Sequence, residues 1–145
     1  MGVDKYQDLE CWRLANELKL EVYALVNNSS ARHDLKFRDQ IFDSARSGPR
    51  NIAEGFGRYE HPEFARFLGF ARGSIVETHN HVGDGCDCGY WSATDGDRVQ
   101  ALAERAAAST TGLIAYLRRT RAPSPGRSRK QIKNAPHAPG ASTEH

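Results

Sequence analysis

The chain has 145 residues, of which 26% are charged and 39% are hydrophobic, a composition typical of one soluble globular domain. No apolar run approaches the roughly 18 residues that a membrane-spanning helix needs, which argues against a membrane protein. The three cysteines are odd in number and unevenly spaced, which argues against a disulfide framework. Since the first residues also lack the layout of a secretory signal, we expect a cytoplasmic protein with no membrane contact.

The net charge of +2 is unevenly distributed along the chain. Residues 1–119 carry 15 Lys and Arg against 17 Asp and Glu, so they sum to −2. Residues 120–145 carry five bases against Glu144 and sum to +4; the bases are Arg121, Arg127, Arg129, Lys130 and Lys133. A basic tail on a nearly neutral domain favours non-specific contact with nucleic acid or another polyanion, although a solvated tail without a partner fits the same pattern.

Residues 9–28 predict a first helix. Their apolar residues recur at the spacing of an amphipathic helix with one core-facing side: Cys11, Leu14, Ala15, Leu18, Val22, Leu25 and Val26. Asp8 is expected to cap this helix, because its carboxylate can accept from the first backbone N–H groups. The segment "NNSSARHD" that follows predicts a short loop, since Asn and Ser side chains bond to their own backbone.

Asp34 is expected to cap a second helix, which Gly55 and Gly57 are expected to end. Pro49 lies inside it and removes one backbone hydrogen bond, so a bend or break is predicted near residues 45–48. The apolar side of this helix carries Phe37, Ile41, Ala45, Gly48, Ile52 and Phe56.

A third helix is predicted from Pro62, which fits the first helical position, and its apolar side extends from Phe64 to Val82. Thr94 or Asp95 is expected to begin a fourth, with its apolar side ending at Leu117. Four amphipathic helices with short connections predict an all-α, antiparallel up-down four-helix bundle over residues 1–121, with a proline-bent second helix. Residues 122–145 are rich in Pro, Gly and Ser and are expected to form a disordered basic tail.

Four potential zinc ligands lie within the ten residues "HNHVGDGCDC": His79, His81, Cys86 and Cys88. Structural zinc sites usually use Cys pairs two to four residues apart, and a Cys-x-Cys pair is uncommon in them. His79 and His81 are two apart and would point to different faces of a helix. The sequence therefore predicts no metal site and no cofactor.

No catalytic pattern is clear either. The run "GFGR" at 55–58 lacks the strand and third glycine of a dinucleotide fingerprint and the Gly-Lys-Ser/Thr of a P-loop. Ser74 lacks the G-x-S-x-G context of a nucleophile elbow. Glu54 and Glu77 could form an acid–base pair across two helices, or could equally be edge charges satisfied by arginines such as Arg58. We expect a protein without enzymatic activity.

Several segments occur in the order and spacing of a known family: "DLECWRLANELKLEVYALV", "SARSGPRNIAEGFGR", "EFARFLGFARGSIVE" and "GYW". Over about residues 6–119 the chain resembles the four-helix-bundle proteins encoded in 23S rRNA intervening sequences, and the accessory protein of diversity-generating retroelements in the same superfamily. The resemblance implies an antiparallel bundle, a homo-oligomeric ring-like pentamer and a basic surface suited to nucleic acid. The resemblance implies that the protein has no enzymatic activity. For the retroelement branch, it also implies a reverse-transcriptase partner.

Seven residues match the family signature by position: Asn51, Glu54, Gly55, Arg58, Gly73, Ser74 and Glu77. We interpret them as structural, with close helix contact at the glycines and a polar network where helices two and three meet. The sequence departs from the family after Glu77, where "THNHVGDGCDCGYW" replaces a largely apolar run. Its glycines and histidines are expected to loosen the end of helix three, while Cys88 takes a position that is usually Leu and is expected to pack.

The leading hypothesis is a non-enzymatic oligomer of otherwise unknown function that binds RNA or DNA non-specifically through phosphates. The alternative is a protein–protein interaction scaffold, such as an accessory partner of a reverse transcriptase, with Trp12, Tyr23, Tyr59 and Trp91 as anchors. The nucleic-acid-binding residues of the first hypothesis are Arg118, Arg119, Arg121, Arg127, Arg129, Lys130 and Lys133.

Overall fold

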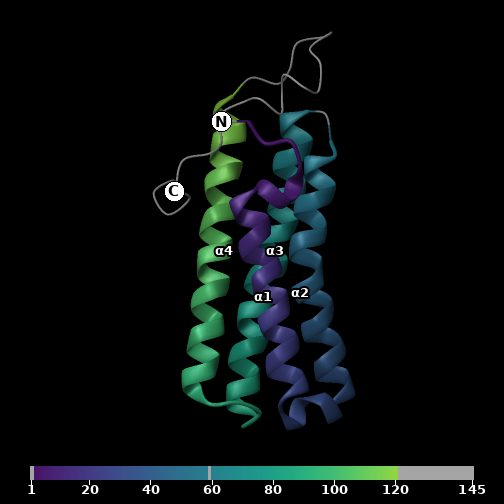
Figure 1. The fold of residues 1–145 in the computed structure, drawn as a ribbon, viewed down its shortest axis with the longest axis vertical. Helices are drawn as coiled ribbons and strands as arrows, with labels where there is room; N and C mark the ends of the chain where they lie inside the picture. Colours follow the sequence, from purple (N-terminus) through teal and green to yellow (C-terminus); the bar gives the residue numbers. More distant parts are fainter. Residues whose placement is uncertain (1, 59, 121–145) are drawn as a thin grey trace.

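The computed structural model describes residues 2–58 and 60–120, which form an all-α four-helix bundle without a β-strand (Figure 1). This confirms the predicted fold class. The helices are α1 (Glu10–Asn27), α2 (Leu35–Phe56), α3 (His61–Asp87) and α4 (Ala93–Arg119), with two short 3-10 helices, η1 (Tyr6–Asp8) and η2 (Ser30–His33). None of these helices is long and apolar enough to cross a membrane. The tail predicted at 122–145 lies outside the described residues, as does Tyr59.

Each helix packs against two others, so that α1, α2, α3 and α4 enclose one core in chain order. Side-chain contacts give the relative direction of the helices. Between α2 and α3, Ser47 contacts Ser74 and Ser44 contacts Thr78, so the residue numbers fall along α2 as they rise along α3. Between α3 and α4, Arg72 contacts Thr111 and His79 contacts Glu104, which shows the same opposite order. Figure 1 shows the connections between consecutive helices at alternate ends of the bundle.

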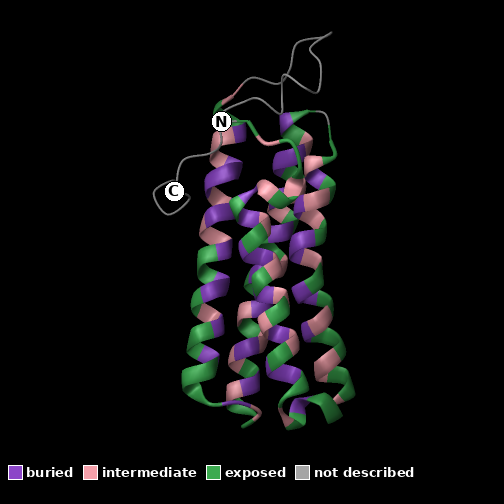
Figure 2. Cartoon of the chain, viewed as in Figure 1, coloured by how far each residue is buried: buried purple, intermediate pink, exposed green. Residues whose placement is uncertain are grey.

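The core lies where the four apolar sides meet, and Figure 2 shows the buried positions turned toward the bundle axis. Ile41, Ile52 and Leu68 are fully buried and Leu113 is buried with them, as their periodicity predicts. Burying one such side chain stabilises the fold by about 1.5–3 kcal/mol. Cys11 belongs to the same core, and burial raises the pKa of its thiol to about 12, so it is not a reactive thiol at neutral pH.

Two predicted helix starts are wrong by one or two residues. Asp8 does not cap α1, because it is the last residue of η1; the N-cap is Leu9, and the Asp8 carboxylate instead lies 3.6 Å from Arg13. Helix α4 begins at Ala93 rather than at Thr94 or Asp95, since Ser92 accepts a hydrogen bond from the Asp95 N–H at 3.1 Å. The predicted loop before α2 contains the 3-10 helix η2.

Helix α2 runs without interruption through Pro49, so the predicted break is absent, while the bend stays a prediction. Its start is as predicted, because the Asp34 carboxylate accepts from the Phe37 N–H at 3.2 Å. Gly57 is the C-cap, as expected, although Gly55 lies within the helix. Near the proline the helices approach closely: a Cβ on Gly48 would lie 3.2 Å from Ile75 Cγ1.

Helix α3 continues without a break to Asp87, and a glycine near its end provides space for packing, while the expected loosening after Glu77 stays a prediction. The Trp91 ring lies directly on Gly85, where a Cβ would overlap its six-membered ring. Its indole N–H donates to the Val82 carbonyl at 2.9 Å. In the same way the Cys86 thiol lies against Gly96 of α4. Gly85 and Gly96 therefore leave room for Trp91 and Cys86 to pack at the α3–α4 turn. Trp91 is buried and is not an exposed anchor.

The same end of the bundle is closed by a hydrogen bond from the Tyr90 hydroxyl to the Asp34 carboxylate. This bond, together with the N–H of Phe37, holds the pKa of Asp34 below its usual range. The bond to Asp34 also raises the pKa of Tyr90 to about 12, because the tyrosinate could not donate and would face a carboxylate. Tyr90 thus joins the turn after α3 to the start of α2.

Replacing Tyr90 with phenylalanine is expected to lower the free energy of unfolding from about pH 5 to 9, with a smaller effect outside that range. The Asp34 contribution is present above its unfolded pKa of about 3.9 and is lost as pH falls through its lower folded pKa. The Tyr90 contribution is present below its unfolded pKa of about 10 and is lost as pH rises toward its raised folded pKa. Urea unfolding of both proteins from about pH 3 to 11 reaches both limits, and a stability difference that is the same at every pH in that wider range contradicts the account.

Candidate nucleic-acid interface

A chain of polar side chains lies between α2 and α3. The Asn51 amide donates to the Ser47 carbonyl at 2.9 Å and to its hydroxyl at 3.0 Å, and the Ser74 hydroxyl donates to Ser47 Oγ at 2.8 Å. One turn further, the Thr78 hydroxyl lies 2.9 Å from Ser44 Oγ and 2.8 Å from the Ser74 carbonyl. Asn51 and Ser74 are therefore linked through the Ser47 hydroxyl, which joins α2 to α3.

At the other end of this contact, α2 and α3 meet at Gly55. A Cβ there would lie 2.8 Å from Phe67 Cβ and 3.0 Å from Phe64 Cδ1, so only glycine allows this approach without a shift. Glu54 and Arg58 form an exposed ion pair at 3.3 Å, and the Arg58 guanidinium lies 4.6 Å from the centre of the Phe67 ring. These three signature residues thus form the corner between α2 and α3.

Gly73 and Glu77 lie elsewhere. No atom lies within 4 Å of a Cβ built on Gly73, so no close helix contact accounts for this glycine. The Glu77 carboxylate lies 3.3 Å from His81 Nε2. Because Gly55 lies opposite Phe67, ten residues before Glu77 on α3, Glu54 and Glu77 are about 15 Å apart along the helix. The structure does not bring them together as an acid–base pair.

The His and Cys residues after Glu77 also diverge. His79 Nε2 lies 2.9 Å from Glu104 of α4, whereas His81 pairs with Glu77 on its own helix. Burial raises the pKa of the Cys86 thiol, and Asp97 and Asp87 raise it further. Cys88 is exposed, contrary to the expectation that it packs, because it is the cap residue that follows α3. Within residues 2–58 and 60–120, no three potential ligands lie close enough to hold a metal ion.

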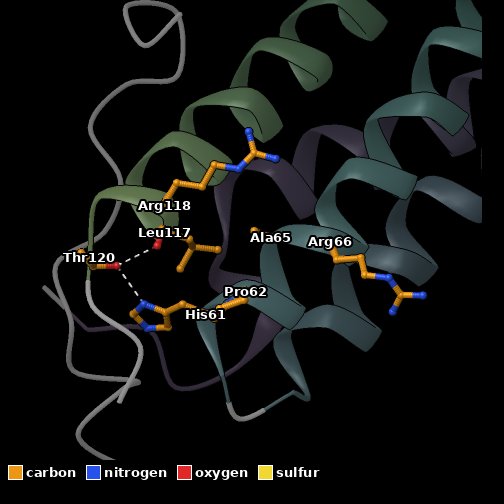
Figure 3. A pocket seen from close by; sticks show the side chains of 7 residues that line it. All are labelled: His61, Pro62, Ala65, Arg66, Leu117, Arg118 and Thr120. Carbon is orange, nitrogen blue, oxygen red and sulfur yellow. Dashed lines mark hydrogen bonds between the residues drawn. The ribbon is translucent and has the colours of Figure 1, made fainter. Parts of the chain in front are cut away.

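Arg118 and Arg119 are exposed on the last turn of α4, at the same end of the bundle as the start of α3. Between these two helices lies an open cavity of about 470 Å³, a volume within the range of small-ligand sites. Figure 3 shows its lining, with Arg118 on one helix and Arg66 on the other, their guanidinium groups pointing in different directions. The lining residues are His61, Pro62, Ala65, Arg66, Leu117, Arg118 and Thr120.

One contact fixes this end of α4. The Thr120 hydroxyl lies 3.2 Å from the Leu117 carbonyl and forms a hydrogen bond of 2.8 Å with His61 Nδ1 (Figure 3). His61 is buried, and it links the first residue of α3 to the residue that follows α4. The end of α4 is therefore held against the first turn of α3, beside Arg118.

The sequence pattern missed His61, Arg66 and Thr120, because 59 positions separate the two residues of this hydrogen bond. The guanidinium groups of Arg66, Arg118 and Arg119 carry N–H donors whose planar geometry matches phosphate oxygens. The remaining predicted nucleic-acid-binding residues lie outside the described residues: Arg121, Arg127, Arg129, Lys130 and Lys133. The described part of the site is thus the cavity between α3 and α4, which Arg66 and Arg118 line from opposite helices.

The comparisons with known proteins found one family that this chain matches. The model of one protein family, the 23S rRNA-intervening sequence protein, matches residues 7–112, which include all the signature residues from Asn51 to Glu77. No curated protein matches the chain. Since the matched segment covers well over half of the sequence, the chain belongs to the 23S rRNA-intervening sequence protein family.

Proposed function

We propose that this protein is a non-enzymatic, oligomeric helical bundle of the cytoplasm that binds RNA or DNA through backbone phosphates, without sequence preference. One observation carries the proposal: residues 118–133 contain seven Lys and Arg and no Asp or Glu. The run begins with Arg118 and Arg119, which are exposed, and Arg118 lines a cavity together with Arg66 at the end of the bundle. Such a concentration of positive charge favours a polyanion over a neutral or acidic partner.

The charge of the rest of the chain restricts where the polyanion binds. Residues 1–117 carry 13 Lys and Arg against 17 Asp and Glu, so most of the bundle repels phosphate. Binding is therefore confined to the α4 end. An oligomer presents one basic run per copy on the same nucleic acid, and this raises the apparent affinity without any new contact.

Neutralising the basic run is expected to weaken RNA binding and to reduce its dependence on salt. In a full-length variant with Arg127, Arg129, Lys130 and Lys133 replaced by glutamine, the slope of log K against log salt should fall by up to about 3 for a single strand, since each phosphate contact contributes about 0.7. Fluorescence anisotropy with a labelled RNA at several salt concentrations measures this slope.

The control replaces four bases of the bundle that are far from this end, Lys19, Arg32, Lys36 and Arg38, with glutamine. This variant has the same net charge as the tail variant and should retain most of the slope. Equal loss in both variants would show that only net charge matters. Binding that is absent, or that is insensitive to salt, contradicts the proposal.

A protein-binding scaffold is the second candidate function. Four large apolar side chains favour it, being about half exposed or more: Leu20 (54%), Leu35 (58%), Phe70 (48%) and Val76 (56%). The aromatic anchors expected from the sequence are weaker candidates, because the Trp12 ring packs against Tyr6 and the Tyr23 hydroxyl accepts from Arg46. The solution mass with and without nuclease separates the candidates. A protein retained stoichiometrically after nuclease treatment favours the scaffold.

A further inference from the structure

Four side chains form an alternating arrangement of guanidinium groups and aromatic rings where α2 turns into α3. We call Arg58, Arg66, Phe67 and Phe70 the arginine–phenylalanine surface. The Arg58 guanidinium lies 4.6 Å from the centre of the Phe67 ring, and the Arg66 guanidinium lies 5.7 Å from Phe67 and 5.1 Å from Phe70. The two rings meet edge to face, with centres 5.8 Å apart and an angle of 84°. Phe70 is 48% exposed.

The backbone holds this surface in place before any ligand arrives. Phe67 packs closely against Gly55. A side chain at position 55 would collide with Phe67, because a Cβ there would lie 2.8 Å from Phe67 Cβ. The Arg58 N–H donates to the Gly55 carbonyl at 2.9 Å, which fixes the backbone of Arg58 within reach of the Phe67 ring. Phe70 lies one helical turn after Arg66 and Phe67, off the apolar side of α3. Its exposed ring therefore contributes little to the core.

The charges of the surface suit a phosphate ligand. Arg58 pairs with Glu54 at 3.3 Å and Arg66 with Glu63 at 3.1 Å, and the side chains of both pairs are exposed. Exposed ion pairs contribute little to stability, so phosphate oxygens can replace these carboxylates as acceptors. Arg66 also lines the cavity that it shares with Arg118, so the surface is continuous with the cationic end of α4 (Figure 3).

We propose that the arginine–phenylalanine surface binds unpaired nucleotides of a single-stranded nucleic acid, with one base stacked on Phe70 and adjacent phosphates contacting Arg58 and Arg66. Every base has an aromatic face, and stacking on an aromatic side chain is tolerant of sequence. In a duplex those faces are covered by neighbouring base pairs, so a phenylalanine on a convex helix surface cannot reach them. The inference rests on the proposed function and adds a preference for unpaired strands.

The test compares full-length wild type with Phe70→Ala, using a labelled 20-nucleotide single-stranded RNA and the duplex of the same sequence. Phe70→Ala should weaken binding to the single strand by about 5- to 100-fold, the loss of one stacked base, and change duplex binding less than twofold. Val76→Ala is the matched control, since Val76 is 56% exposed on the same helix and is not part of the surface. Phe70→Trp should retain single-strand binding.

A second readout separates stacking from charge. Arg66→Gln should reduce the salt slope for the single strand by about 0.7, whereas Phe70→Ala should leave the slope unchanged. If Phe70→Ala weakens neither ligand, or weakens both equally, the stacking proposal is overturned while salt-dependent binding leaves the phosphate proposal standing. If no wild-type binding occurs at low salt, both fail. A change in solution mass with Phe70→Ala, without a change in single-strand binding, would show that this surface joins protein chains instead.

Discussion

Replacing Gly85 with alanine is expected to lower the free energy of unfolding by about 3 kcal/mol or more, within the range for removing a large buried side chain. The new methyl group would occupy the position of the Trp91 ring, so the indole has to leave α3. That movement also breaks its hydrogen bond to the Val82 carbonyl and exposes a ring that is now only 9% accessible. Urea unfolding followed by circular dichroism measures the change.

Tryptophan fluorescence gives a second measurement, because an indole transferred to water emits at longer wavelength. The control is Gly69→Ala on the same helix, where no atom lies within 4 Å of the added Cβ. Alanine is favoured over glycine in a helix by up to about 1 kcal/mol, so this control should be neutral or stabilising. Equal effects of the two substitutions would mean that Trp91 does not pack on Gly85.

The second large effect is expected for Gly55→Ala, which should lower the free energy of unfolding by about 1–2 kcal/mol. Overpacking costs about 1–3 kcal/mol, and the better helix propensity of alanine offsets part of that. The added Cβ would lie 2.8 Å from Phe67 Cβ and 3.3 Å from the Phe64 carbonyl oxygen, and neither atom can move without its backbone. Urea unfolding of both proteins at the same protein concentration measures the loss, so that any self-association affects them equally.

Gly73→Ala is the matched control for Gly55, because both glycines belong to the family signature while only Gly55 is enclosed. A loss of stability with Gly55→Ala but not with Gly73→Ala supports a packing role for Gly55 alone. Since Gly55 also positions Phe67 and Arg58, its substitution should weaken single-strand binding as well. Unchanged stability would show that α2 and α3 do not approach as closely as described.

Much of the fold could be predicted from the spacing of apolar residues. Ile41 and Leu68 lie on the buried sides of α2 and α3, as the helical period requires, because a 3.6-residue repeat decides which side of a helix can leave water. Resemblance to the family added the signature residues. Errors at helix starts, such as Asp8, came from local capping patterns, which the neighbouring 3-10 turn η1 overrides.

The candidate site could be predicted only in part. Arg118 and Arg119 stand out in the sequence as the beginning of a basic run, and charge needs no tertiary contact to be recognised. Arg66 and Phe70 cannot be recognised in the sequence in this way. A single arginine, or a phenylalanine that lies off the apolar side of its helix, belongs to no repeating pattern. Their relation to Arg58 and Phe67 appears only once α2 turns into α3.

By itself, then, the sequence determined four amphipathic helices, the residues that share their core and the basic run that begins at Arg118. These properties depend on periodicity and composition, which are local along the chain. Only the tertiary structure decided that Gly85 lies beneath Trp91 while Gly69 faces open space, and that His61 meets Thr120. The reason is that glycines look alike in a sequence, and what surrounds each one depends on which helix packs against it and at which turn.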